Sequence, residues 1–218
     1  HEAEISAYSL PKFRKKGYFK LLLAKALAEL KSFAIPDLLF VCESSSIPGK
    51  AVMNALQAGY EHTEYFMRFS KGKFSPLNTY RINLRKARPE DLEEVVTVHR
   101  QVFNDGCAET KSLIQSRLLS DTREQYLAVL QGKVIGMLAI NTDDEDVSIF
   151  GLGIIPEYRG GGYGKELLCS VVESLLLAGK SRITIEVDSD NRNALMLYKK
   201  MGFYVEVAYE YYRANLRS

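Results

Sequence analysis

The stretch PEYRGGGYGKELL, from Pro156 to Leu168, places an arginine and a group of glycines ahead of a run of apolar residues. Backbone N–H groups of a glycine turn that enters a helix form a binding site for an anion, and the helix dipole adds to it. Gly162 and Gly164 have no side chains, so phosphate groups could approach the backbone there. Arg159 could donate to the same anion or brace the loop.

Two familiar phosphate-binding motifs do not fit this stretch. A P-loop requires Ser or Thr after its Gly-Lys pair, and here Glu166 follows Lys165. The dinucleotide fingerprint GxGxxG fails as well, because its third glycine position falls on Lys165 or Leu167. The remaining pattern is R-x-x-G-x-G, between a strand that ends in proline and an amphipathic helix.

The elements that position this loop follow from the hydrophobic patterns around it. Strands are predicted at 80–87, at 124–143 as two strands with a turn at 131–133, at 146–156, at 182–188, and as one or two final strands at 203–216. Helices are predicted at 89–103, at 110–121, directly after the glycines, and at 191–202. This order predicts an α/β fold of the mixed-sheet (α+β) kind, in layers around one sheet.

An internal repeat divides the chain. The segment 11–23 matches 156–168, the segment 38–44 matches 183–189, and the segment 51–60 matches 194–203 after a small gap. Three matching blocks in the same order indicate duplication. We predict a partial, degenerate N-terminal copy at 1–72, a linker at 73–79 with turn-type residues, and a complete C-terminal domain at 80–218.

The glycine loop resembles the acetyl-CoA loop of the GNAT superfamily of N-acetyltransferases, whose signature is Q/R-x-x-G-x-G/A. The resemblance covers residues 80–216 and implies tandem acyl-CoA N-acyltransferase folds. It also implies a bulge that splays the strand before the loop from the next strand, where backbone groups bind the pantetheine arm. The residues that it assigns to acetyl-CoA are Ile154, Ile155, Arg159, Gly160, Gly161, Gly162, Tyr163, Gly164 and Asn191. An N-cap role is equally open for Asn191.

The same resemblance names two catalytic residues. A tyrosine on the short helix stands near the cofactor sulfur in this family, and here it is Tyr198, whose phenol could protonate the departing thiolate. Glu186 occupies the position of the base in the ribosomal-protein acetyltransferases. By strand alternation Glu186 faces the cleft, while Ile185 and Val187 face the core. Weaker alternatives for the base are Asp188, Asp190 and Asp146.

The first copy lacks these groups. Phe19, Val41 and Ala55 stand where the second copy has Gly164, Glu186 and Tyr198. A phenyl ring at the first of these positions would occupy the place where phosphate must approach the backbone. We therefore expect a single acetyl-CoA site, in the C-terminal copy.

Composition and charge argue against several other classes of protein. The 29 basic and 27 acidic residues give a net charge of +2, which is too balanced for a nucleic-acid-binding surface. The 3 cysteines are widely spaced and the 3 histidines have no ligand spacing, so we expect no metal and a reduced cytoplasmic location. Lys25 and Glu29 interrupt the longest apolar run, so no membrane span is expected.

Together these features predict an enzyme that moves an acetyl group from acetyl-CoA to a primary amine by direct attack in a ternary complex. The acceptor is expected to be a small-molecule or peptide amine, whose identity the sequence does not reveal. Two alternatives are a non-catalytic acyl-CoA-binding pseudoenzyme and an acyltransferase that resembles mycothiol synthase, itself a tandem of this fold. The partial first copy leaves an unfinished sheet edge, so a homodimer is an open expectation.

Overall fold

The computed structural model describes residues 2–104 and 109–215. This part of the chain divides into two compact units. The first unit is built from residues 2–66, 187–192 and 205–215, and the second from 67–104, 109–186 and 193–204. Each unit is described by itself below.

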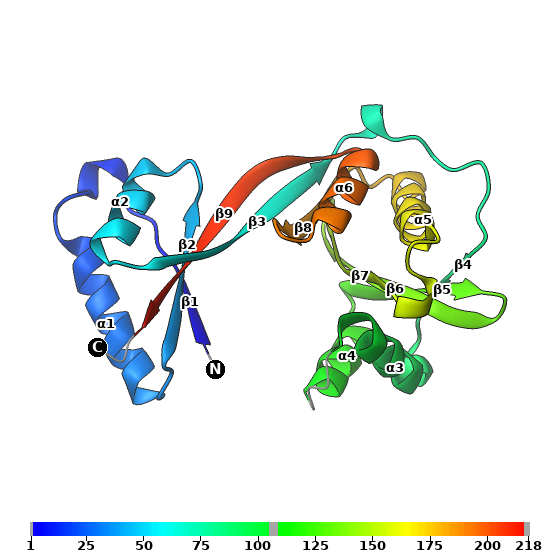
Figure 1. The fold of residues 1–218 in the computed structure, drawn as a ribbon, viewed down its shortest axis with the longest axis horizontal. Helices are drawn as coiled ribbons and strands as arrows, with labels where there is room; N and C mark the ends of the chain where they lie inside the picture. Colours follow the sequence, from blue (N-terminus) through cyan, green and yellow to red (C-terminus); the bar gives the residue numbers. More distant parts are fainter. Residues whose placement is uncertain (1, 105–108, 216–218) are drawn as a thin grey trace. The chain divides into compact units, whose positions relative to one another are not determined.

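The first unit packs two helices against one face of its sheet (Figure 1). Its elements are β1 (Glu2–Ser6), α1 (Tyr18–Ser32), β2 (Asp37–Glu43), α2 (Ile47–Ala55), most of β3 (Gly59–Phe69) and the greater part of β9 (Phe203–Asn215). Strand β2 pairs in parallel with β1 and antiparallel with β9. Leu38, Phe40 and Cys42 alternate along β2 and form a core with Leu23 of α1 and Met53 of α2.

The second unit holds the remaining elements. These are β4 (Asn83–Lys86), α3 (Leu92–Phe103), α4 (Thr110–Leu118), β5 (Arg123–Leu130), β6 (Lys133–Asp143), β7 (Asp146–Ile154), α5 (Tyr163–Leu177), most of β8 (Arg182–Asp188) and most of α6 (Arg192–Lys200). Strands β4 to β7 pair antiparallel in chain order, and β7 pairs in parallel with β8. The predicted mixed α/β architecture is therefore confirmed.

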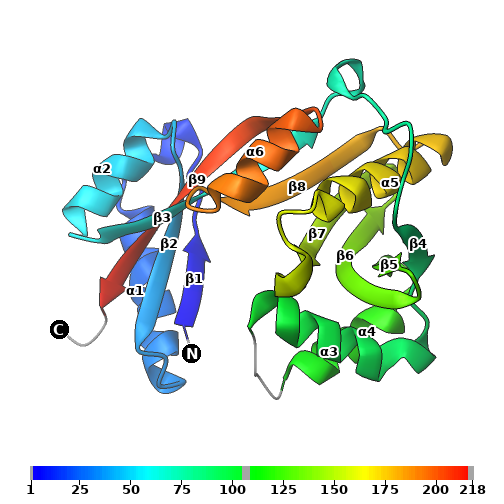
Figure 2. The same ribbon diagram turned by 45° about the vertical axis from the view of Figure 1, so that its right-hand side comes forward.

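Helices cover both faces of this second sheet. Helices α3 and α4 lie on one face, and α5 lies on the other (Figures 1 and 2). The apolar stripe predicted after the glycine loop is the buried side of α5, formed by Leu167, Leu168, Val171, Val172 and Leu175. Burying such a stripe is what holds an amphipathic helix on a sheet, and it fixes the glycine loop at the N-terminus of α5.

The predicted elements recur in the structure, with three adjustments at their ends. The helix expected from Pro89 begins as a 3₁₀ turn, Pro89–Asp91, before α3. The expected turn at 131–133 is a hairpin whose residues Gln131 and Gly132 have φ values of +50° and +83°. The final one or two strands form the single strand β9, which takes part in both units.

The two halves of the chain share an order of elements at a constant spacing. Helices α1 and α5 begin at Tyr18 and Tyr163, and α2 and α6 begin at Ile47 and Arg192, each 145 residues apart (163 minus 18). The gap assumed before the third matching block is therefore wrong. Met53, not Ala55, stands at the position equivalent to Tyr198, and both Met53 and Tyr198 are buried.

Lys73 ends the 3₁₀ turn Lys71–Lys73, and residues 74–82 form neither helix nor strand, whereas the role of 73–79 as a linker stays a prediction. The compact units follow different boundaries from the predicted repeat, since residues 187–192 and 205–215 join the first unit. None of the described helices has both the length and the apolar character needed to cross a membrane. The described residues bring together no cluster of three or more His, Cys, Asp or Glu side chains as metal ligands.

Candidate active site

Strand β7 parts from β8 halfway along its length. Their parallel pairing runs from Asp146 opposite Arg182 to Ile149 opposite Ile185. On the other side of β7, Gly151 and Leu152 lie opposite a single residue of β6, which is a β-bulge. Gly151 has a φ of +60°, which glycine adopts without strain. A bulge therefore lies at the place that the resemblance implied.

A pocket of about 410 Å³ lies where the two strands part. Its wall comes from β5, β6, β7, β8 and α6, all within the second unit. The lining residues are Arg123, Asn141, Ser148, Ile149, Phe150, Gly151, Thr184, Ile185, Glu186 and Tyr198. Both residues predicted to be catalytic thus line the same pocket.

Tyr198 reaches the pocket from α6 and is 6% exposed. Its ring lies 6.2 Å from the ring of Phe203, which helps to fix its position. Burial raises the pKa of Tyr198 to about 12, because the charged phenolate would lose its hydration. The side chain is therefore held as a neutral phenol that can donate a proton.

Glu186 reaches the same pocket from the end of β8. Ile185 and Val187 are buried, whereas Glu186 is exposed, as the alternation of the strand predicts. Two of the weaker candidates for the base, Asp146 and Asp188, have partners outside the pocket. Asp146 forms an ion pair with Arg182 at 3.1 Å, and Asp188 accepts a hydrogen bond from the N–H of Asp190 at 2.7 Å. Of the acids considered, Glu186 lines the pocket.

The glycine loop joins β7 to α5. Gly160 and Gly162 have φ values of +79° and +85°, and Gly162 directly precedes the first helical residue, Tyr163. Since glycine has no side chain, it provides no cap for the N–H groups of the first turn. Uncapped N–H groups at a helix N-terminus are the donors that a phosphate needs.

Arg159 braces the loop. Its Nε donates to the carbonyl oxygen of Ile154 at 2.9 Å, and its Nη2 donates to that of Val102 at 2.8 Å. These bonds tie the end of β7 to the last turn of α3. Of the two readings of Arg159, the structure shows the brace, and a contact with phosphate stays a prediction.

The two isoleucines before the loop are buried, with exposed fractions of 7% for Ile154 and 2% for Ile155. The N–H of Ile155 donates to the carbonyl oxygen of Ile135 at 2.9 Å, so it belongs to the sheet. Asn191 falls in the first unit and directly precedes α6, where its own N–H donates to the carbonyl oxygen of Asp188 at 3.0 Å. The roles of these three residues toward acetyl-CoA stay predictions.

A second brace, which the sequence analysis missed, links Arg81 to the glycine loop. The Arg81 Nη2 donates to the carbonyl oxygen of Gly161 at 2.6 Å, and its guanidinium lies 4.3 Å from the ring centre of Tyr163. The buried carboxylate of Glu166 accepts from the Nε of Arg81 at 2.6 Å and from its backbone N–H at 2.8 Å. The spacing of 85 residues between Arg81 and Glu166 leaves no signal of this contact in the sequence.

Replacing Glu166 with alanine is expected to lower the free energy of unfolding by about 2–4 kcal/mol. The change leaves the backbone N–H groups of Arg81 and Ile82 without the carboxylate that accepts them at 2.8 Å and 3.4 Å. Urea unfolding would measure the loss, with the exposed Glu157→Ala as a control that should change it by less than about 0.5 kcal/mol. Equal stability of the two variants would contradict the proposed brace.

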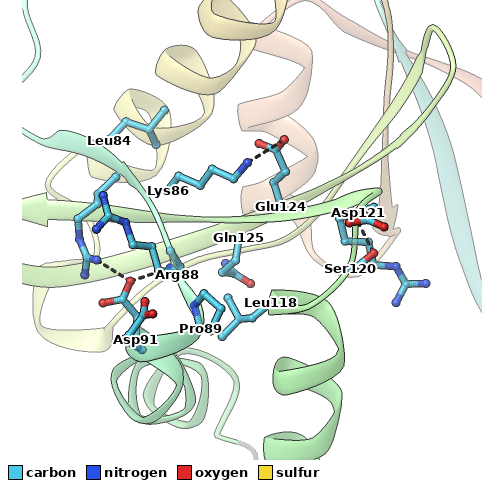
Figure 3. Close-up of a pocket in the computed structure, with 14 residues that line it drawn as sticks. Leu84, Lys86, Arg88, Pro89, Asp91, Leu118, Ser120, Asp121, Glu124 and Gln125 are labelled. Atoms are coloured by element: carbon cyan, nitrogen blue, oxygen red, sulfur yellow. Dashed lines mark hydrogen bonds and ion pairs between the residues drawn. The ribbon is translucent and has the colours of Figure 1, made fainter.

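A larger hollow of about 990 Å³ lies beside the edge strand β4, near the starts of α3 and β5 (Figure 3). Four of its charged residues form two pairs: Arg85 with Asp91 at 2.7 Å and Lys86 with Glu124 at 3.0 Å. The hydrogen bond from Arg85 holds the pKa of Asp91 below its ordinary value. Since none of the predicted site residues lines this hollow, it is a paired surface network rather than the candidate site.

Comparisons with known proteins agree with this geometry. The sequence model of the acetyltransferase (GNAT) family matches residues 90–203, just over half of the chain. A GCN5-related N-acetyltransferase from Sphaerobacter thermophilus has a TM-score of 0.82 and 19% identity, over 100% of this chain and 74% of its own. A tandem GNAT protein from the clavulanic acid biosynthesis pathway has a TM-score of 0.76 and 16% identity, over 100% of this chain and 76% of its own.

A further similar structure is a GCN5-related glucosamine N-acetyltransferase region within a fungal multi-domain GH3 β-N-acetylglucosaminidase. Its TM-score is 0.77 at 14% identity, over 97% of this chain and 29% of its own. At these identities the structural likenesses establish the fold and nothing finer.

Proposed function

Because the chain belongs to the acetyltransferase (GNAT) family, and is therefore an acyltransferase, we propose that it transfers an acetyl group from acetyl-CoA to a primary amine. The observation that supports this most is that Glu186 and Tyr198 line one pocket at the parting of β7 and β8. The glycine loop follows the same strand β7, so the proposed phosphate site and the proposed reaction site lie along one path.

The residues present fit acetyl-CoA as a substrate. The pyrophosphate would bind the uncapped first turn of α5, where the positive φ of Gly162 turns the backbone. The pantetheine arm would lie along the opened end of β7, in the manner of an added strand. The braces of Arg159 and Arg81 hold this loop in place before the substrate arrives, which lowers the entropic cost of binding.

In the proposed reaction the amine nitrogen attacks the thioester carbonyl. A C–N bond forms, the C–S bond breaks, and the sulfur leaves with the bonding electrons. Glu186 accepts the proton that the amine must lose, directly or through water. Tyr198 donates its proton to the departing thiolate, and solvent then restores it. The acceptor in this proposal is a small-molecule or peptide amine.

The proposed location is the cytoplasm. The buried, unpaired thiols of Cys42 and Cys169 fit a reduced compartment of this kind.

Calorimetric titration with acetyl-CoA tests the binding half of this proposal. We expect one site per chain, because Phe19 occupies in the first half the position that Gly164 has in the loop. Two sites would contradict the assignment to the second half, and no binding would contradict the use of acetyl-CoA. Binding without amine-dependent release of coenzyme A would favour the pseudoenzyme.

A further inference from the structure

Two arginines lie in or next to the pocket that is lined by Glu186 and Tyr198. Arg123 lines it from the start of β5, and also lines the larger hollow. Arg117, in the last turn of α4, lies behind the wall, with its guanidinium carbon 4.8 Å from the ring centre of the lining residue Phe150. The pocket therefore has a cationic side that the proposed transfer chemistry does not use.

The cationic side has a fixed geometry. Arg123, Asn141, Ser148 and Thr184 are register partners on four successive strands, so they form one row across the sheet. Glu186 follows Thr184 by two residues on β8, and it therefore shares the face of the row. The backbones of β5 and β8 are three strand spacings apart, about 14 Å. The two charged lining residues thus stand on one face of the sheet, at opposite sides of the pocket.

Arg117 is held in place by a buried amide. Its Nη1 donates to the Oε1 of Gln125 at 3.0 Å, and Gln125 is 1% exposed. Gln125 is itself fixed, because its Nε2 donates to the carbonyl oxygen of Leu138 at 2.6 Å. The Nε of Arg117 is buried and has no hydrogen-bond partner among the described residues. A buried donor that is left unpaired in this way costs free energy unless a ligand satisfies it.

The described residues supply no full counter-charge to the two arginines. Neither Arg117 nor Arg123 forms an ion pair with a carboxylate in the part of the chain that the structure describes. The closest acid to Arg123 in sequence, Glu124, is paired with Lys86 in the larger hollow. Burial, and then repulsion by Arg123, lowers the pKa of Arg117.

We propose that the acceptor amine carries an anionic group, a carboxylate or a phosphate, which Arg123 binds while the amine lies beside Glu186. This inference rests on the proposed function and names the substrate class of the same pocket. An acid at one side of the pocket and a guanidinium at the other side complement a molecule that has an ammonium at one end and an anion at the other. A small amino acid, or an amine that bears a phosphate, fits this description.

The experiment measures kcat/KM for matched pairs of amines by release of coenzyme A. One series runs from glycine to 5-aminopentanoate, a second contains the matching aminoalkyl phosphates, and the neutral controls are the corresponding amino amides. We expect at least one anionic series to exceed its neutral controls by about 10- to 100-fold, which is the usual effect of a charge-assisted hydrogen bond. The better series identifies the anion, and its best chain length reports the distance between Arg123 and Glu186.

Variants assign the preference to Arg123. Arg123→Gln should remove most of the 10- to 100-fold preference and leave the Kd for acetyl-CoA within about threefold. Arg123 is exposed, so the substitution should not disturb folding. The matched control is Lys111→Gln, which removes the same charge from an exposed position on α4 outside the pocket. This control should keep the preference.

The outcomes separate this inference from the proposed function. Equal rates with anionic and neutral amines, or a preference that persists in Arg123→Gln, would overturn the inference and leave acetyl transfer intact. Absence of acetyl-CoA binding together with absence of turnover would overturn both. If acetyl-CoA binds but no amine reacts, titration of the complex with the anionic amines decides the matter. Binding that Arg123→Gln weakens supports the inference, and no binding overturns it.

Discussion

Replacing Tyr198 with phenylalanine is expected to lower kcat by about 10- to 1,000-fold while the affinity for acetyl-CoA stays within about twofold. The substitution removes the hydroxyl group and keeps the ring that packs 6.2 Å from Phe203. The fold and the glycine loop should therefore be unchanged. What is lost is the proton that coenzyme A needs as its sulfur leaves.

The pH dependence of kcat gives a second measure of the same residue. Because burial raises the pKa of Tyr198 to about 12, its phenol stays protonated up to and beyond the ordinary tyrosine pKa of about 10. With saturating acceptor, kcat should therefore not fall between about pH 8 and pH 10 through loss of this proton. The matched control for Tyr198→Phe is Tyr204→Phe, which removes a hydroxyl group from an exposed tyrosine. Equal turnover in Tyr198→Phe and in the wild type would remove the proton-donor role.

Replacing Gly164 with phenylalanine is expected to weaken acetyl-CoA binding by more than about 100-fold. Gly164 is the second residue of α5, and a side chain there starts toward Ile154 and Leu197, so a phenyl ring would crowd the first turn, whose N–H groups the pyrophosphate needs. The equivalent position in the first half holds Phe19, as the second residue of α1. Since a helix of the same length forms there with phenylalanine, the change should not prevent α5 from forming.

Gly164→Ala is the matched control for this prediction. An added Cβ would meet the side chains of Ile154 and Leu197 at 3.7 Å and 3.8 Å, which are ordinary van der Waals distances. The alanine variant should therefore bind acetyl-CoA within about threefold of the wild type, and stabilise α5 slightly. Calorimetric titration measures both variants. Undiminished binding in Gly164→Phe would show that the loop does not hold the phosphates.

The parts of the fold that the sequence predicted are those with strong local patterns. The apolar stripe of α5, the alternation of β8 and the positive-φ pair at the hairpin turn each determine a local structure within a few residues. The same local signals placed Glu186 on the open face of β8 and Tyr198 on the helix after it. Both residues line one pocket in the structure, and their catalytic roles stay predictions.

The parts that could not be predicted depend on contacts between distant segments. Arg81 meets Glu166 across 85 residues, and Arg117 stacks on Phe150 from a different element. Neither pair has a spacing or a motif in the sequence that distinguishes its residues from other arginine, glutamate or phenylalanine residues. The equivalence of Ala55 to Tyr198 failed for another reason. Sequence similarity alone favoured a gap before the third matching block, whereas α2 and α6 have equal lengths and begin at the same spacing as α1 and α5.

The pairing of β9 with β2 has a consequence for the order in which the protein is assembled. Residues 209–215 of β9 lie opposite residues 37–43 of β2, so the sheet of the first unit is completed by a segment made after every other strand. Strands β4 to β7 need only their neighbours along the chain and can pair as they leave the ribosome. The N-terminal segment, although synthesised first, must therefore wait with an open edge, and a chain stalled before β9 would expose that edge to aggregation.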